Sequence, residues 1–244
     1  MTNALAQAVE MLRGAQRIVV TTGAGMSKES GIPTFRDAPN ALWANYDPQA
    51  LATRDGFRRD PALVWRWYAD RRAMIAQAQP HAGHVALAQW EARAHNFVVL
   101  TQNIDGLHAA AGSRRMVEMH GTIWRLRCTS CDYARDDRRV PLPEVPPSCA
   151  CGALLRPDVV WFGEMLQPAH LDAAHQALAH CDALLVVGTS GLVYPAAGFA
   201  AEAKAAGAHV VEINPEPTPL SELADVFVPG GAMSVLPALA AQIR

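Results

Sequence analysis

The strongest constraint on the fold of this chain is the alternation of short apolar segments with longer segments of helical periodicity. Continuous apolar runs of this length suit the strands of a parallel sheet that is covered on both faces. Strands alternating with helices form βαβ units, so we expect an α/β fold with a doubly wound parallel sheet. The expected strands cover 18–20, 97–100, 183–187, 209–213 and 225–228, and the expected helices cover 4–13, 61–77, 83–93, 169–180, 196–206 and 234–243.

Two segments interrupt this alternation and are expected to be insertions. The first, 37–82, contains three tryptophans and the helix expected at 61–77. The second, 122–158, contains four of the five cysteines and a proline-rich stretch at 141–147. A chain of 244 residues is long enough for one large domain with insertions.

The composition excludes several classes of partner. The formal net charge is −2, which gives no electrostatic basis for binding nucleic acid or an anionic membrane surface. No apolar run approaches the roughly 18–20 residues that span a bilayer. The first residues lack the basic segment and apolar core of a signal peptide, so we expect a cytoplasmic protein. The sequence is compatible with a monomer but does not determine the oligomeric state.

The cysteines form two close pairs that are typical of a structural zinc site. Cys128 and Cys131 are separated by two residues, Cys149 and Cys151 by one, and seventeen residues lie between the pairs. Four thiolates fill the tetrahedral coordination of one zinc ion and leave no position for a catalytic water. Two disulfides or four free thiols are the alternatives. Cys181 precedes an apolar segment, and we interpret it as a small core residue.

A glycine-containing turn follows the first expected strand. Gly23 and Gly25 would let backbone N–H groups approach a pyrophosphate at the start of a helix. The three-glycine fingerprint is incomplete, because Lys28 occupies the third position. Taken alone, this pattern fits an ordinary strand-to-helix turn equally well.

Polar residues are concentrated where the strand expected at 97–100 ends. The segment 101–108 contains amide, carboxylate and imidazole side chains, and His120 follows shortly afterwards. Ligands of open α/β sheets bind outside the carboxyl ends of the strands. The sequence therefore predicts a cofactor crevice at this edge.

These segments resemble the signature motifs of the sirtuins, which are NAD-dependent protein lysine deacylases. The residues at 101–105 read TQNID, those at 120–121 read HG, and 23–36 resemble the family's cofactor-binding loop GAGxSxESGIPxFR. Lys28 departs from the alanine usual at its position. The resemblance covers nearly the whole chain and implies a Rossmann-type domain formed by 1–36, 83–121 and 159–244. The helical insertion 37–82 and the zinc-ribbon insertion 122–158 would form a smaller domain.

The resemblance also implies roles for individual residues. His120 matches the catalytic base, Asn103 would hold the nicotinamide ribose, and Asp105 would accept a hydrogen bond from the carboxamide. Phe35 would screen the bond between nicotinamide and ribose from water, and Arg36 would face the phosphates. The complete set implied for binding NAD is Gly23, Ala24, Gly25, Ser27, Phe35, Arg36, Trp43, Gln102, Asn103, Ile104, Asp105, Gly188, Thr189, Ser190, Asn214, Pro215, Glu216 and Ala232.

The implied chemistry explains why a histidine is needed. The acyl-lysine oxygen attacks C1′ of the nicotinamide ribose and nicotinamide leaves, after which the ribose 2′-hydroxyl attacks the acyl carbon. A hydroxyl needs a base that titrates near pH 7, and histidine does so. The product would be 2′-O-acyl-ADP-ribose. A structural role is expected for His81, His84, His95, His170, His175, His180 and His209. His108 is close to the site in sequence and could belong to it, but a structural role is favoured.

Tyr68 and Arg71 are predicted to select the acyl group. They are three residues apart on an expected helix and so share a face. They resemble the Tyr-x-x-Arg motif of class III sirtuins, which accept succinyl, malonyl or glutaryl lysine, because a guanidinium and a phenol can bind a terminal carboxylate. The alternative is a solvated arginine-rich face with Tyr68 as a core aromatic. Ala52 would keep the pocket roomy.

The resemblance also identifies a substrate-binding strand. Val160, Trp161, Phe162 and Gly163 would pair with the acylated peptide as an added β-strand. Desuccinylation and demalonylation are thus favoured and deacetylation is possible, but the sequence does not rank these activities or identify the substrates.

Two other functions are compatible with an NAD site of this kind. One is mono-ADP-ribosyl transfer to a protein side chain, and the other is non-catalytic NAD sensing. The presence of His120 and of the Tyr68–Arg71 pair argues against the first, and the presence of His120, Asn103 and Asp105 argues against the second.

Overall fold

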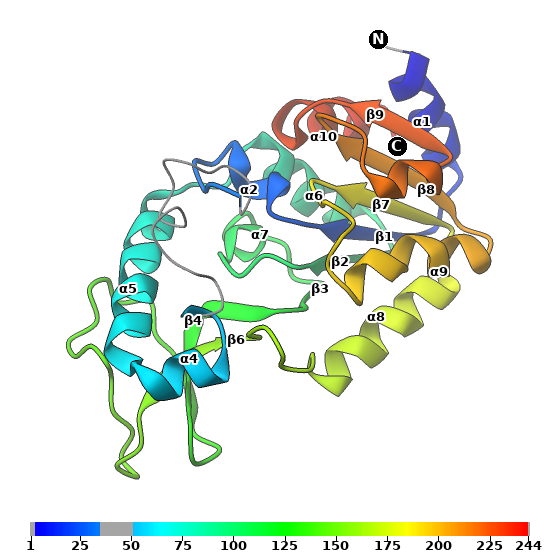
Figure 1. Cartoon of the computed structure of the whole chain (residues 1–244). Helices are drawn as coiled ribbons and strands as arrows, with labels where there is room; N and C mark the ends of the chain where they lie inside the picture. Colours follow the sequence, from blue (N-terminus) through cyan, green and yellow to red (C-terminus); the bar gives the residue numbers. More distant parts are fainter. Residues whose placement is uncertain (1–2, 35–50, 244) are drawn as a thin grey trace.

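The computed structural model describes residues 3–34 and 51–243, and its larger part is a six-stranded parallel sheet (Figure 1). The strand order is β3-β2-β1-β7-β8-β9, and every neighbouring pair is parallel. This confirms the predicted sheet. The strands are β1 Arg17–Thr22, β2 Asn96–Thr101, β3 Met116–Glu118, β7 Ala183–Val187, β8 His209–Asn214 and β9 Val226–Pro229.

Helices cover both faces of this sheet, which explains why its central strands are apolar throughout. Val20 of β1 packs in the core under α1 Asn3–Arg13, α6 Ala82–Arg93 and α10 Ala232–Ala240. Val19, its neighbour, points to the opposite core, under α8 Pro168–His180 and α9 Phe199–Ala205. Successive side chains of a strand alternate between faces, so both faces need apolar residues.

The smaller part contains a three-stranded antiparallel sheet and two helices, at the lower left of Figure 1. Its strands, in the order β5-β4-β6, are β4 Gly121–Cys128, β5 Ala134–Asp136 and β6 Leu155–Val159, and its helices are α4 Arg54–Arg59 and α5 Pro61–Gln77. Asp60 caps α5 by accepting a hydrogen bond from the N–H of Leu63 at 2.8 Å. Trp65, Trp67 and Tyr68 of α5 pack against the sheet in a separate core.

The structure differs from the sequence prediction where elements are short. β3 and the one-turn helix α7 Leu107–Ala110 were not expected, because three or four residues give no periodic signal. The helix expected after the glycine turn is present as the single turn α2 Gly25–Lys28. The helix expected at 196–206 is divided into a 3₁₀ turn, η1 Ala196–Gly198, and α9. A second 3₁₀ turn, η2, covers Pro219–Glu222. The helix expected at 234–243 begins two residues earlier.

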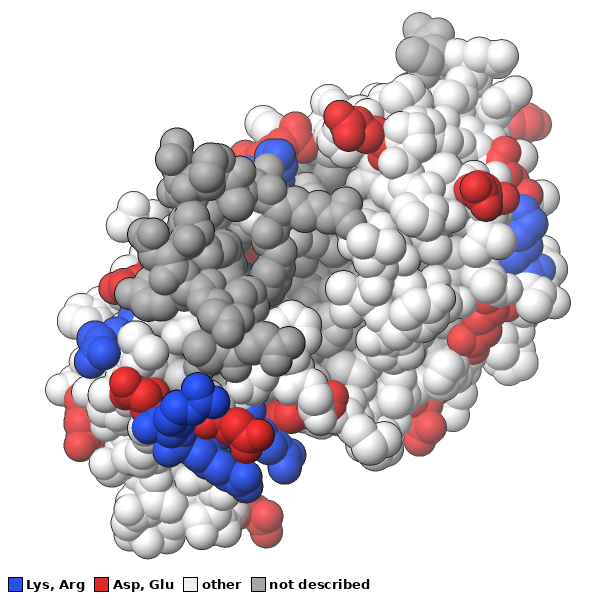
Figure 2. All heavy atoms as spheres, viewed as in Figure 1, with Lys and Arg blue, Asp and Glu red and all other residues white. Residues whose placement is uncertain are grey.

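The face shown in Figure 2 carries both acidic and basic side chains, in keeping with the low net charge. Figure 2 shows basic side chains gathered over α4, where Arg54 and Arg58 are exposed and Arg58 forms an ion pair with Asp55. No helix in the described ranges has both the length and the apolarity needed to cross a membrane.

Candidate active site and zinc-binding cluster

The turns that follow β1 and β7 pack tightly against each other at the carboxyl edge of the sheet. The N–H of Gly23 donates to Val187 O at 3.0 Å, and the N–H of Gly25 donates to Gly188 O at 2.8 Å. A Cβ atom on Gly23 or on Gly25 would lie 2.8 Å from the oxygen of Gly188, which has a φ of +60°. These glycines therefore allow the two turns to meet, and their own N–H groups are already bonded there rather than free for a phosphate.

A hydrogen-bonded network joins this turn to the segment after β2. Asn103 Nδ2 donates to Gly23 O at 2.9 Å and to Ser27 Oγ at 3.1 Å. Ser27 Oγ donates to Asp105 Oδ2 at 2.7 Å, and the N–H of Leu107 donates to Asp105 Oδ1 at 2.8 Å. Burial raises the pKa of the Asp105 carboxyl, while these two hydrogen bonds act in the opposite direction. Three residues that the sequence assigned to the site thus lie together.

His120 has the geometry of a neutral base. Its Nδ1 lies 2.9 Å from Gln102 O, and a carbonyl only accepts, so Nδ1 carries the proton and Nε2 has a free lone pair. Burial lowers the pKa of His120, so the ring is neutral at pH 7. The side chain of Gln102 donates to Thr189 Oγ1 at 3.2 Å, which links this region to the β7 turn.

The segments after β7, β8 and β9 complete this edge. Asn214 Nδ2 donates to Thr189 O at 3.1 Å, and Ser190 follows in the same turn. Pro215 and Glu216 are exposed beyond the end of β8.

Ala232 is buried at the start of α10, beside Gly83 of α6. Glu29, which the sequence analysis did not single out, caps this helix by accepting a hydrogen bond from the N–H of Met233 at 2.8 Å.

Three histidines lie in a buried row behind the site. The ring centroids of His81 and His84 are 4.2 Å apart, and those of His84 and His108 are 5.0 Å apart. Burial lowers the pKa of His84 to about 2 and the pKa of His108 to about 4. All three are buried, and His108 Nε2 lies 3.0 Å from Thr22 Oγ1. His84 and His108 are therefore neutral at pH 7, and the three rings pack against one another in the interior.

Tyr68 and Arg71 both lie on α5. Tyr68 is buried, its oxygen accepts a hydrogen bond from Trp161 Nε1 at 2.8 Å, and burial raises the pKa of Tyr68 to about 12. The guanidinium carbon of Arg71 lies 5.4 Å from the Trp67 ring, and Arg71 Nε is shielded from solvent. Burial lowers the pKa of Arg71, while the charges of Tyr68 and Asp105 raise it. Arg71 is therefore not a solvated arginine, whereas Tyr68 does pack in the core cluster with Trp65 and Trp67, as the alternative interpretation expected.

The segment predicted as a substrate strand is a loop. β6 ends at Val159, and Val160, Trp161, Phe162 and Gly163 follow it as a loop that turns at Gly163, where φ is +79°. The segment is held by two neighbouring segments: Val160 N–H donates to His120 O at 2.9 Å, and Phe162 N–H donates to Ala52 O at 2.8 Å. Phe162 forms an isolated parallel β-bridge with Thr53.

Glu164 holds this loop in place through hydrogen bonds, and it was not among the site residues predicted from the sequence. It accepts hydrogen bonds from Arg54 Nε and Arg156 at 2.6 Å each, and from the N–H of Trp161 at 2.9 Å. The guanidinium of Arg156 stacks on Trp161, 3.2 Å from the ring centroid. The only signal in the sequence was an acidic residue directly after Phe162 and Gly163.

Three of the residues assigned to the cofactor, Phe35, Arg36 and Trp43, lie outside the described residues. Trp124 was not expected at the site, yet its Nε1 donates to Asp105 O at 2.6 Å. Nothing in the sequence around Trp124 distinguishes it from a core tryptophan.

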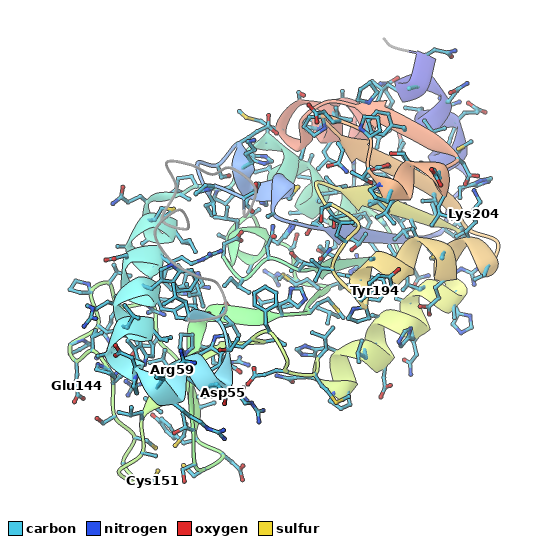
Figure 3. All side chains as sticks on the ribbon, in the orientation of Figure 1. Asp55, Arg59, Glu144, Cys151, Tyr194 and Lys204 are labelled. Carbon is cyan, nitrogen blue, oxygen red and sulfur yellow. The ribbon has the colours of Figure 1, made fainter. Side chains whose placement is uncertain are left out.

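The four clustered cysteines are positioned to bind one structural zinc. Their sulfur atoms all lie within 4.8 Å of one another, with Cys128 Sγ 3.5 Å from Cys151 Sγ and Cys131 Sγ 3.8 Å from Cys149 Sγ. Tetrahedral zinc with bonds of about 2.3 Å separates its sulfur ligands by about 3.8 Å. A disulfide needs about 2 Å, so the alternative of two disulfides is wrong. Figure 3 shows Cys151 at the tip of the smaller part, away from the large sheet.

Relatives with known names match almost the whole chain. The chain is 53% identical over 238 residues to NAD-dependent protein deacylase 2 of Pyrobaculum aerophilum, covering 96% of this chain and 94% of that protein. It is 49% identical to NAD-dependent protein deacylase 1 of Caldanaerobacter subterraneus subsp. tengcongensis, covering 92% of this chain and 93% of that protein.

Solved structures agree with the fold and the family. A Sir2 homologue in complex with NAD has a TM-score of 0.92 and 41% identity, covering 97% of this chain and 92% of that chain. Sir2Af2 bound to a myristoylated histone peptide has a TM-score of 0.80 and 34% identity, covering 99% of this chain and 97% of that chain. The model of the Sir2 family matches residues 23–195. This chain therefore belongs to the Sir2 family.

Proposed function

We propose that this protein is an NAD-dependent protein-lysine deacylase that prefers acyl groups ending in a carboxylate, with succinyl and malonyl lysine as its best substrates. The observation that carries the proposed deacylation is the neutral, oriented His120 beside the network of Asn103, Ser27 and Asp105. Relatives named as NAD-dependent protein deacylases and a homologue bound to NAD support the choice of co-substrate.

The proposed roles follow from hydrogen-bonding capacity. Nε2 of His120 accepts the proton of the ribose hydroxyl that attacks the acyl carbon. Asp105, whose carboxylate is already oriented by Ser27, accepts from the carboxamide of nicotinamide. Asn103 holds the nicotinamide ribose, and the turns after β1, β7 and β8 hold the rest of NAD, as is usual at the carboxyl edge of such sheets.

Orientation of Tyr68 supports the preference for an acidic acyl group. Because Tyr68 Oη accepts from Trp161, its own proton is available to donate to another group. Arg71 on the same helix would supply a second, charged donor. Sir2Af2 is bound to a myristoylated, apolar acyl peptide. A guanidinium in the pocket would disfavour such an acyl chain, because burying an uncompensated charge is unfavourable.

The acylated peptide is proposed to bind along the loop Val160–Gly163. Phe162 is 52% exposed although its backbone N–H is bonded to Ala52, so its side chain is available to a ligand. An extended peptide would pair with the remaining backbone groups of the loop.

We further propose that 1–36, 83–121 and 159–244 form the NAD domain and that 37–82 and 122–158 form the small domain. We also propose that the protein works in the cytoplasm.

A panel of acyl peptides tests the proposed function. The protein is incubated with NAD and matched acetyl-, succinyl- and malonyl-lysine peptides, and peptide mass and nicotinamide release are both followed. We expect equimolar acyl loss and nicotinamide release, fastest for the succinyl and malonyl peptides. No acyl loss from any peptide would refute the proposal. ADP-ribose attached to protein would instead identify a transferase, and NAD binding without turnover an NAD sensor.

Replacing Arg71 with methionine separates recognition of the carboxylate from the common chemistry. Removing one partner of a buried charge pair costs about 2–5 kcal/mol, so kcat/KM for the succinyl peptide should fall at least 30-fold. The acetyl peptide has no carboxylate, so its kcat/KM should change much less. Arg66→Met, an exposed arginine of the same helix, is the matched control. An equal loss on both peptides would contradict the proposed role of Arg71.

A further inference from the structure

Glu212 is a carboxylate without exposed surface in β8, and the roles proposed above do not use it. It accepts hydrogen bonds from Asn214 Nδ2 at 2.8 Å, from Thr218 Oγ1 at 2.7 Å and from Ser221 Oγ. None of the ion pairs among the described residues includes it. Burying a carboxylate without a cation is unfavourable, so its hydrogen bonds must all be made.

Glu212 decides which way the amide of Asn214 points. A carboxylate only accepts hydrogen bonds, so Asn214 must turn its nitrogen toward Glu212. The second hydrogen of the same nitrogen donates to Thr189 O at 3.1 Å. Both amide hydrogens are therefore used, and Oδ1 is directed away from Glu212 as a hydrogen-bond acceptor.

Asn214 lies where a ligand would meet this acceptor. It is the last residue of β8, and the preceding residue, Ile213, accepts a hydrogen bond from the N–H of Gly188 at 3.0 Å. Gly188 in turn packs against the turn after β1. The acceptor is thus at the carboxyl edge of three neighbouring strands, where dinucleotides bind.

We propose that Glu212 is a positioning residue that holds Asn214 Oδ1 ready to accept a hydrogen bond from a hydroxyl of the adenosine ribose, and that this arrangement excludes dinucleotides with a 2′-phosphate. The inference rests on the NAD site proposed above. A ribose hydroxyl can donate to Oδ1, whereas a 2′-phosphate is mainly an acceptor and carries negative charge.

Charge around the loop supports the exclusion of a phosphate. The segment from Asn214 to Glu222 contains Glu216 and Glu222 and no lysine or arginine. Sites that accept a 2′-phosphate commonly supply an arginine nearby.

Binding of NAD and of NADP by calorimetry tests the inference without depending on deacylation. Glu212→Leu should raise the Kd for NAD about tenfold, and the ratio of Kd for NADP to Kd for NAD should fall by a similar factor, since one oriented hydrogen bond is lost. Glu212→Gln keeps an acceptor oxygen and should restore most of the difference. Glu10→Leu, which changes an exposed glutamate of α1 outside this loop, should bind both dinucleotides as the original protein does.

A double mutant separates positioning from a general structural role. Asn214→Ala should reproduce the loss of discrimination by itself, and adding Glu212→Leu to it should change the Kd for NAD no further. An additional loss in the double mutant, or an unchanged Kd ratio in either folded single mutant, would overturn the inference. If Glu212→Leu does not fold, Glu212→Ala takes its place in the same comparisons. Failure of the peptide panel with normal NAD binding would refute the proposed deacylation while leaving this test intact.

Discussion

Replacing His120 with alanine is expected to reduce deacylation of every acyl peptide by about 10²–10⁴-fold, the usual contribution of a general base. The hydrogen bond of His120 Nδ1 to Gln102 O leaves Nε2 as the only free base on this ring. NAD should still bind, because the turns after β1, β7 and β8 do not depend on this side chain. Steady-state turnover of the succinyl peptide and calorimetric titration with NAD measure the two effects.

The pH profile gives a second readout for His120. A base must be neutral to act, and burial lowers the pKa of His120. Activity should therefore persist as the pH falls through the ordinary histidine range near 6.5 and should be lost only below it. His95→Ala, which changes an exposed histidine, is the matched control and should keep full activity. Deacylation within tenfold of normal in His120→Ala would refute the assignment.

Loss of zinc is expected to have the second large effect. One zinc per chain should be found, and Cys131→Ser should abolish it, because a Cys₄ site has no replacement ligand. Binding free energies of structural zinc are about 10–16 kcal/mol in small zinc-dependent peptides, so the three-stranded sheet that carries the cysteines should unfold without the metal. Zinc content by atomic emission and thermal unfolding followed by circular dichroism measure this result.

The consequence for activity follows from where the cluster lies. Cys128 ends β4, which pairs with β6, and Leu155 of β6 accepts a hydrogen bond from Trp65 of α5, the helix that carries Tyr68 and Arg71. Cys131→Ser should therefore weaken binding of acyl peptides. Cys181→Ala is the control, since Cys181 is buried in the core under α8 and α9 and should leave zinc content at one. Full zinc content in Cys131→Ser would contradict the Cys₄ assignment.

Most strands of the large sheet could be predicted from the sequence, because strands buried on both faces have continuous apolar sequences. Val19 and Val20 pack in different cores, so neither position tolerates a polar residue, and the strand is visible as an apolar run. The edge strand β3 has only half-buried residues, so it has no continuous apolar sequence and was not predicted.

The candidate site was predicted unevenly. Segments around Gln102 to Asp105 and His120 follow recognisable motifs, so these residues were found and the structure brings Asn103, Ser27 and Asp105 into one network. The hydrogen bonds of Glu164 to Arg54 and Arg156 were not predicted, because no local sequence pattern relates these residues and they meet only in the folded chain. Pairing of the substrate peptide with 160–163 stays a prediction; the segment directly follows β6, and Phe162 forms an isolated parallel bridge with Thr53.

The sequence by itself determined the α/β class, through its local periodicity. It also determined the cysteine spacing and the membership in the family, through contiguous motifs. Only the tertiary structure decided how side chains far apart in the chain orient one another. The tautomer of His120 depends on Gln102 O, the donor direction of Tyr68 depends on Trp161, and the amide of Asn214 depends on Glu212 and Thr189. Hydrogen-bond direction is a property of pairs of groups in contact, and those contacts exist only after the chain has folded.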